Sequence, residues 1–243
     1  MNRNLDLILI SNSHSTRGFT LVELAIVLVI VALLTGGLMM GITAQRNAAE
    51  NSDAQRQLDN IREALLGYAM AKGNLPCPAN PALTSSDFAV GTEDRPTPPP
   101  SSPCNRMYGV IPWVTLGLPE TDPWGRRFTY FASSSFSAPV LPGALASFTL
   151  ATLGNANIKD SASNSANIAS NIPAVVVSHG SSGAGAWQPN GTQLPGATGD
   201  ELENANSTLT FVSRTPDNNF DDLVTWIVPS ILMSKMVAAG RLP

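Results

Sequence analysis

The sequence predicts an α+β fold in which one long N-terminal α-helix, serving as membrane anchor and spine, packs against a C-terminal antiparallel β-sheet. Three observations lead to this prediction. An apolar run lies near the N-terminus, and a polar stretch with the spacing of a helix face follows it, with no proline before Pro76. Short apolar segments separated by Asn-, Ser- and Gly-rich loops occupy the rest of the 243 residues. Strands placed after a helix in this way form a sheet that buries one face against it.

The predicted helix begins with the apolar run. From Leu24 to Ile42 only Thr35 and three glycines interrupt the apolar side chains. A helix of about 20 such residues matches the hydrocarbon core of a bilayer. Arg3 and Arg17 precede it, and positive charge before a membrane helix favours a cytoplasmic N-terminus. We therefore expect a single-pass inner-membrane protein whose later residues lie in the periplasm.

Beyond Ile42 the sequence becomes polar but keeps a helical pattern. Apolar residues recur at spacings of four, three, four and three, which places them on one helix face: Ala54, Leu58, Ile61, Leu65 and Tyr68. The helix is predicted to run from Phe19 to Lys72, about 80 Å at 1.5 Å per residue, so its second half must serve as the spine of a domain. The glycines in its first half, Gly36, Gly37 and Gly41, either supply flexibility or let membrane helices pack closely.

The start of the helix carries a specific motif. The residues Gly18-Phe19-Thr20-Leu21-Val22-Glu23 resemble the cleavage and methylation signal of type IV prepilins and of type II secretion pseudopilins. The resemblance implies that a prepilin peptidase cuts after Gly18, removes residues 1–18 as a leader, and methylates the new N-terminal Phe19. It also implies a pilin-like fold in which residues 73–243 form a β-rich globular domain.

Glu23 is the carboxylate of this motif, and the resemblance gives it a role in assembly. An acid inside a membrane segment costs about 3 kcal/mol. Cleavage would create an ammonium group on Phe19, and buried opposite charges need one another. Pairing of Glu23 with the Phe19 amine of a neighbouring subunit would fix the axial register of a helical bundle. The alternative is a local role, because a carboxylate in the first turn also suits the helix dipole.

The sequence holds two cysteines, Cys77 and Cys104. An even count in an exported domain favours a disulfide. The bridge would close a loop of about 27 residues and stabilise the domain by about 3–4 kcal/mol in the chain-entropy model. The loop includes the proline-rich stretch 95–103, which cannot form regular structure, so the disulfide would tether it.

The segments after the helix are predicted from alternation and turn residues. Residues 108–113 are expected to form a turn-rich connection, and a turn at 122–125 precedes the first strand, which includes Phe128 and Tyr130. Pro229 suits the first position of a short helix that runs to Ala239, with Gly240 as its cap. Four further strands are expected at 147–153, 174–178, 208–213 and 223–228, separated by loops that include 155–171 and 180–206.

A second resemblance concerns the C-terminal half. The residues at 122–125 and at 221–226 are similar to landmarks of the major pseudopilin of type II secretion, a family in which a C-terminal loop binds calcium. The resemblance implies a possible calcium site formed by oxygen ligands of four residues: Asp217, Asn219, Asp221 and Asp222. The alternative is a solvated turn, since Asp and Asn tolerate unusual backbone angles. No other cofactor is expected.

Composition and motifs argue against two other classes. The net charge is −4 and the pI about 5.1, without the basic patch of a nucleic-acid-binding protein. Ser178 and His179 are adjacent, but they do not match a nucleophile elbow, so we expect no enzyme and a loop position for His179. Trp113, Trp124 and Trp226 are expected in the core, whereas Trp187, in a glycine-rich loop, is the candidate for partner contact.

These observations predict a structural subunit, a pilin or pseudopilin, of a type IV pilus or type II secretion pseudopilus. The subunit would be processed after Gly18 and assembled through its N-terminal helix. The resemblance implies other pilin or pseudopilin subunits, the prepilin peptidase, an inner-membrane assembly platform and a motor ATPase as partners. The alternative is a membrane-anchored periplasmic binding or adhesin module that does not polymerise.

Overall fold

The computed structural model describes residues 18–96 and 103–243, without the side chains of residues 36–44. The leader up to Arg17 and most of the predicted proline-rich loop therefore lie outside the described residues. The same holds for the side-chain environment of Gly36, Gly37 and Gly41. The chain divides into two compact units, Met1–Asn47 and Ala48–Pro243, which are described separately below.

Helix α1 (Leu21–Lys72) is the long helix that the sequence predicts. In the first unit its apolar side chains from Leu21 to Leu34 are exposed. Within the described part of the chain, no helix is both long and apolar enough to cross a membrane. Gly73 follows the helix with φ +83°, and its N–H donates to the carbonyl of Ala69 at 2.7 Å. A Cβ at Gly73 would lie 2.3 Å from the Leu145 carbonyl oxygen, so only glycine fits this helix end.

In the second unit α1 contributes one face to the hydrophobic core. Four of the five residues that the periodicity places on this face are at most 3 % exposed: Ala54, Leu58, Ile61 and Leu65. Leu66 and Ala69 are buried beside them. Tyr68 is half-buried, and its hydroxyl donates a hydrogen bond to the carboxylate of Glu93. The predicted role of this half of the helix as the spine of a folded unit is thus visible in the packing.

The main sheet has four antiparallel strands in the order β1-β2-β5-β7. They are β1 (Tyr108–Val110), β2 (Thr129–Ala132), β5 (Ala174–Ser178) and β7 (Leu223–Trp226). A second sheet has the order β4-β3-β6 and consists of β3 (Ala156–Lys159), β4 (Ala169–Ile172) and β6 (Thr210–Val212). Strands β3 and β4 are antiparallel, whereas β3 and β6 are parallel.

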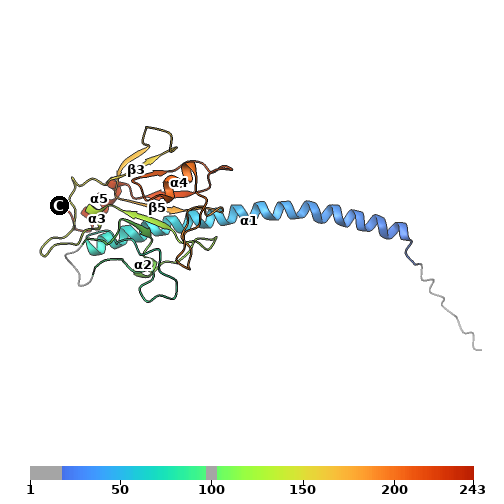
Figure 1. Ribbon diagram of the computed structural model, residues 1–243, viewed down its shortest axis with the longest axis horizontal. Helices are drawn as coiled ribbons and strands as arrows, with labels where there is room; N and C mark the ends of the chain where they lie inside the picture. The colour runs from blue at the N-terminus through green and yellow to red at the C-terminus, as the bar shows by residue number, and fades with distance from the viewer. Residues whose placement is uncertain (1–17, 97–102) are drawn as a thin grey trace, which may run out of the picture. The chain divides into compact units, whose positions relative to one another are not determined.

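The second unit is a stack of three layers, with the main sheet between α1 and the second sheet (Figure 1). Strand β5 shows why. Ala174 and Val176 pack in the core cluster that includes α1, whereas Val175 and Val177 pack in a second cluster with Ile158, Ile172 and Phe211 of the second sheet. Successive side chains of a strand point to opposite faces, so β5, which is apolar from Ala174 to Val177, is buried on both sides.

Four short helices complete the unit: α2 (Trp113–Leu116), α3 (Ser134–Ser137), α4 (Gly199–Ala205) and α5 (Pro229–Ala238). Helix α5 is the predicted C-terminal helix, with Pro229 in its first turn and Gly240 after its cap at φ +68°. It buries Leu232 and Met236 in the cluster with α1. The Lys235 ammonium lies 3.3 Å from the Glu63 carboxylate of α1.

The structure corrects three predictions. Residues 147–153 form turns rather than a strand, because Phe148 alone is buried, whereas Leu150 and Leu153 are 52 % and 64 % exposed. Residues 108–110 belong to β1, so the strand after the turn at 122–125 is the second. The predicted loops 155–171 and 180–206 contain β3, most of β4 and α4. Their Asn- and Ser-rich sequences conceal strands that need only a few buried side chains, such as Ala156 and Ile158.

The predicted disulfide between Cys77 and Cys104 is confirmed, with an S–S distance of 2.02 Å and a Cα–Cα distance of 5.5 Å. It joins the segment after α1 to the segment before β1. The loop is held at other points as well, because the Cys77 N–H donates to the Glu93 carboxylate at 3.2 Å and Arg106 pairs with Asp94 at 2.6 Å.

Candidate processing and assembly site

The residues around the predicted cleavage point are accessible. Gly18, Phe19 and Thr20 precede α1 in a non-helical conformation, and the Phe19 side chain is 84 % exposed. A Cβ placed on Gly18 would meet no atom within 4 Å. Within residues 18–96 and 103–243, nothing packs against the Gly18 side of this peptide bond.

Thr20 and Glu23 form a capping box at the start of α1. The Thr20 backbone N–H donates to Glu23 Oε2 at 3.2 Å, and the Glu23 backbone N–H donates to Thr20 Oγ1 at 3.2 Å. The Thr20 hydroxyl also donates to Glu23 Oε2 at 3.2 Å. Such a box satisfies two of the backbone donors that a helix leaves free at its N-terminus. It explains why α1 begins at Leu21 rather than at Phe19.

The capping box gives Glu23 a partner within its own chain. The local role that the sequence left open is thus present, and the residue missed by the sequence analysis is Thr20. The signal was available, because a threonine followed three positions later by a glutamate before an apolar run is the pattern of the box. Both members lie after the predicted cleavage point, so removal of residues 1–18 would leave the box intact.

The structure separates the four predicted calcium ligands. Asp217 accepts a hydrogen bond from the Arg214 guanidinium at 2.6 Å, which lowers the pKa of Asp217, and its other oxygen accepts from the Asn219 N–H at 2.8 Å. Asp221 and Asp222 instead lie near Glu201 of α4. One carboxylate oxygen from each of these three residues lies within 4.8 Å of the others.

The cluster of Glu201, Asp221 and Asp222 has the chemistry of a hard-cation site. Asp222 is buried, and its Oδ1 has no hydrogen-bond partner among the described residues. Burial raises the pKa of Glu201, and the carboxylates of Asp222 and Asp221 raise it further. Clustered carboxylate oxygens are the ligands that Ca²⁺ prefers, so these residues fit the ion better than the predicted set. Glu201 was missed because it lies in a segment predicted as a loop.

His179 lies in the loop that follows β5, as predicted, and it is fully buried there. Its Nε2 lies 2.8 Å from the Thr129 hydroxyl, and its Nδ1 lies 3.6 Å from Asp222 Oδ1. The hydroxyl of the adjacent Ser178 donates to Asp122 Oδ2 at 2.8 Å, so it points away from the imidazole. His179 thus ties β2 to the acidic cluster.

Of the four tryptophans, Trp113 is buried in the core with 6 % of its surface exposed, whereas the other three are partly buried. Trp124 donates from its indole to Glu50 Oε2 of α1 at 3.0 Å. Trp187, the candidate for partner contact, lines a pocket with Tyr108 and Arg106.

The capped, apolar start of α1 and the exposed glycine–phenylalanine junction before it are features of an N-terminal processing signal. The comparison with protein families identifies that signal. Residues 13–39 match the prokaryotic N-terminal methylation motif, the signal of type IV pilins and pseudopilins. This match confirms the resemblance drawn from Gly18 to Glu23. No curated protein matches the chain, and no solved structure matches it.

Proposed function

We propose that this chain is a subunit of a type IV pilus or of a type II secretion pseudopilus, processed after Gly18 and assembled through α1. The observation that carries the proposal is the methylation motif over residues 13–39, with Glu23 fixed at the third position of the helix by the capping box. The function is structural: the helices pack together in the filament, and the β-rich unit forms its surface.

The accessible junction between Gly18 and Phe19 supports processing by a prepilin peptidase. Cleavage would place a new ammonium group four residues before Glu23. The box uses Oε2 of Glu23, and among the described residues Oε1 has no hydrogen-bond partner, so it could pair with the Phe19 amine of a neighbouring subunit. The carboxylate would then hold its own helix start and set the register of the next subunit.

Before assembly, the helix would anchor the subunit in the inner membrane with the β-rich unit in the periplasm. The apolar run from Leu24 to Ile42 and the preceding Arg17 support this arrangement. The disulfide between Cys77 and Cys104 supports an oxidising compartment. Assembly would further require a platform protein and a motor ATPase.

Substitution of Glu23 separates the two roles of its carboxylate. Glutamine at this position still completes a capping box but cannot pair with an ammonium ion. We expect Glu23→Gln and Glu23→Ala both to abolish incorporation into filaments, while mass spectrometry finds the same methylated Phe19 terminus in both variants and in the wild type. Incorporation of Glu23→Gln at the wild-type level would refute the register role and leave only the cap.

The cluster of Glu201, Asp221 and Asp222 is proposed to hold calcium. When bound, the ion would supply the positive charge that these three carboxylates lack. It would link α4 to the segment that precedes β7. Its role would be to stabilise the unit rather than to take part in a reaction.

A further inference from the structure

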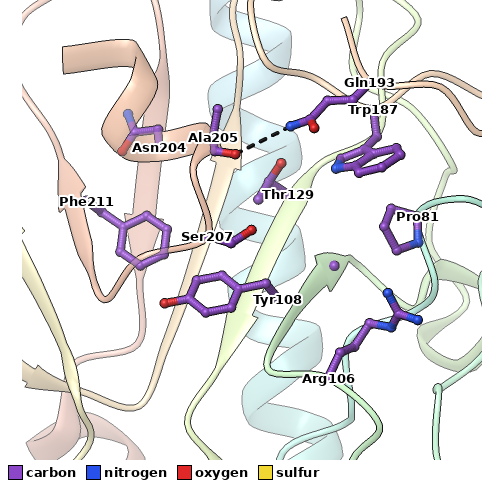
Figure 2. A pocket seen from close by; sticks show the side chains of 11 residues that line it. Pro81, Arg106, Tyr108, Thr129, Trp187, Gln193, Asn204, Ala205, Ser207 and Phe211 are labelled. Atoms are coloured by element: carbon purple, nitrogen blue, oxygen red, sulfur yellow. Dashed lines mark hydrogen bonds between the residues drawn. The ribbon is translucent and has the colours of Figure 1, made fainter. Parts of the chain in front are cut away.

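The pocket that contains Trp187 is lined by several stretches that are far apart in the sequence. They include the start of β1 with Arg106 before it, Thr129 of β2, the loop that carries Trp187 and Gln193, and the chain from the end of α4 to β6; Pro81 completes the lining. Figure 2 shows the rings of Tyr108 and Trp187 on opposite sides of the space, with Ser207 and Thr129 between them. The pocket has a volume of about 140 Å³. Since a water molecule occupies about 30 Å³, this is room for one six-membered ring.

The aromatic walls are fixed before any ligand binds. The Tyr108 ring lies 4.9 Å from Phe131 and 6.5 Å from Phe211, between ring centroids, and its hydroxyl donates to the carbonyl of Thr208. Burial raises the pKa of Tyr108 to about 12, so the phenol stays neutral. The Trp187 side chain is partly buried against the core cluster, and its backbone carbonyl accepts from the Arg127 N–H at 2.8 Å. Rigid walls reduce the entropy that binding costs.

The polar groups of the pocket keep unused hydrogen-bonding capacity. Gln193 donates from its amide nitrogen to the carbonyls of Gly185 at 2.9 Å and Ala205 at 3.4 Å, which leaves Oε1 as an acceptor (Figure 2). Arg106 uses Nε to bind Asp94 at 2.6 Å. Within the described residues, its two terminal nitrogens and the Ser207 hydroxyl have no hydrogen-bond partner.

The charge of the pocket restricts the ligand. Arg106 is the only charged residue among those that line it, and Asp94 compensates that charge. The site therefore has no net attraction for a phosphate or a metal ion. Two aromatic faces suit the C–H groups of a saturated ring, because the face of an aromatic ring is negative. Guanidinium, amide and hydroxyl groups placed around an apolar pocket suit hydroxyl groups on the rim of such a ring.

We propose that this pocket binds one neutral hexopyranose unit of a glycan. The ring packs against Trp187 and Tyr108, and its hydroxyls bond to Arg106, Gln193 and Ser207. The proposal does not depend on assembly into a filament, since all these residues lie in the second unit. Sugar binding at this pocket would be compatible with a filament subunit and with a membrane-anchored module that does not polymerise.

The test uses the full chain in a zwitterionic detergent without a sugar headgroup. Methyl glucoside, galactoside and mannoside are titrated separately, and saturation transfer to the sugar protons reports binding. The blocking variant is Ser207→Asn, whose larger side chain fills part of the pocket. Ser207 has φ +60°, a backbone conformation that asparagine tolerates. Ser163→Asn, on an exposed loop, is the matched control. Trp187→Phe keeps an aromatic ring but reduces its face.

We expect at least one glycoside to bind the wild type and Ser163→Asn saturably, with Ser207→Asn binding it about tenfold more weakly or more, a loss of about 1.4 kcal/mol or more. Trp187→Phe should bind with intermediate affinity. Absence of saturable binding for all three glycosides would overturn the proposal. So would equal binding by Ser207→Asn, or competition by inorganic phosphate at the same concentration.

Discussion

At the scale of single residues, the capping box changes how the methylation motif is understood. The resemblance assigns Glu23 a role through its charge, yet its carboxylate and the Thr20 hydroxyl also hold the first turn of α1 by three hydrogen bonds. The box places the carboxylate beside the residues that processing would expose. The Glu23 side chain therefore caps the helix and is also the group proposed to pair with the neighbouring subunit.

Substitution Thr20→Ala should loosen the start of α1 without changing the charge of Glu23. Loss of an N-cap residue costs about 1 kcal/mol, which is about fivefold in a local equilibrium. The amide of Glu23, which donates to Thr20 Oγ1, should exchange its hydrogen about fivefold faster. Thr20→Ser, which retains the hydroxyl, is the control. Equal exchange rates in both variants would show that the box does not hold the helix start.

The acidic cluster predicts a stabilising effect of calcium. An ion present at 100 times its Kd adds about 2.7 kcal/mol to the free energy of unfolding, and the midpoint of a thermal melt measures it against a chelator. Glu201→Gln should reduce this response. Asp217→Asn should not, because Asp217 is paired with Arg214 outside the cluster. A response lost only in Asp217→Asn would instead favour the ligand set predicted from the sequence.

The same cluster predicts the direction of a pH effect in the presence of chelator. The folded chain raises the pKa of Glu201 above its usual value of 4.5, so the folded state binds the proton more tightly than the unfolded state. The contribution of Glu201 to the free energy of unfolding is fully present below pH 4.5 and is lost as the pH rises through the raised pKa. Glu201→Gln should flatten this part of the stability curve.

At the scale of elements, the disulfide and α1 each hold distant parts of the second unit together. Cys77→Ser combined with Cys104→Ser should lower the free energy of unfolding by about 3–4 kcal/mol, because the unfolded chain regains the entropy of the open loop. Denaturant titration measures the loss. Wild-type protein under reducing conditions should unfold at the same midpoint as the double variant, and a difference between the two would show that the serines cause other damage.

Leu65 tests the packing of α1 against the main sheet. It is fully buried in the core cluster, and replacement of a buried leucine by alanine costs about 2–5 kcal/mol. Leu202→Ala, at a leucine that is 45 % exposed, should cost much less. Equal effects in a denaturant titration would mean that the second half of α1 is not part of the core.

At the scale of the whole molecule, the sequence predicts the elements that are marked by a regular spacing of apolar residues or by a short local motif. The face of α1, strand β5 and the cap after α5 were predicted because four-and-three spacing, an unbroken apolar run and a terminal glycine are local signals. The second sheet was not predicted, since β3 and β4 bury few side chains and β3 meets β6 only through a parallel pairing with a distant segment. For the same reason the approach of Glu201 to Asp221 and Asp222, and the pocket lined by residues from distant segments, could not be predicted.

The position of β5 between two layers has a consequence for the order in which the chain folds. Its partner β7 and the strand β6, which pairs with β3, both come late in the sequence. Until Thr210 to Trp226 has been synthesised, one edge of β5 and one edge of β3 lack their hydrogen-bond partners, and open strand edges recruit other chains. Once this stretch is present, β6 completes the second sheet and β7 completes the main sheet. The risk of aggregation is therefore concentrated in the interval before that stretch has joined the two sheets.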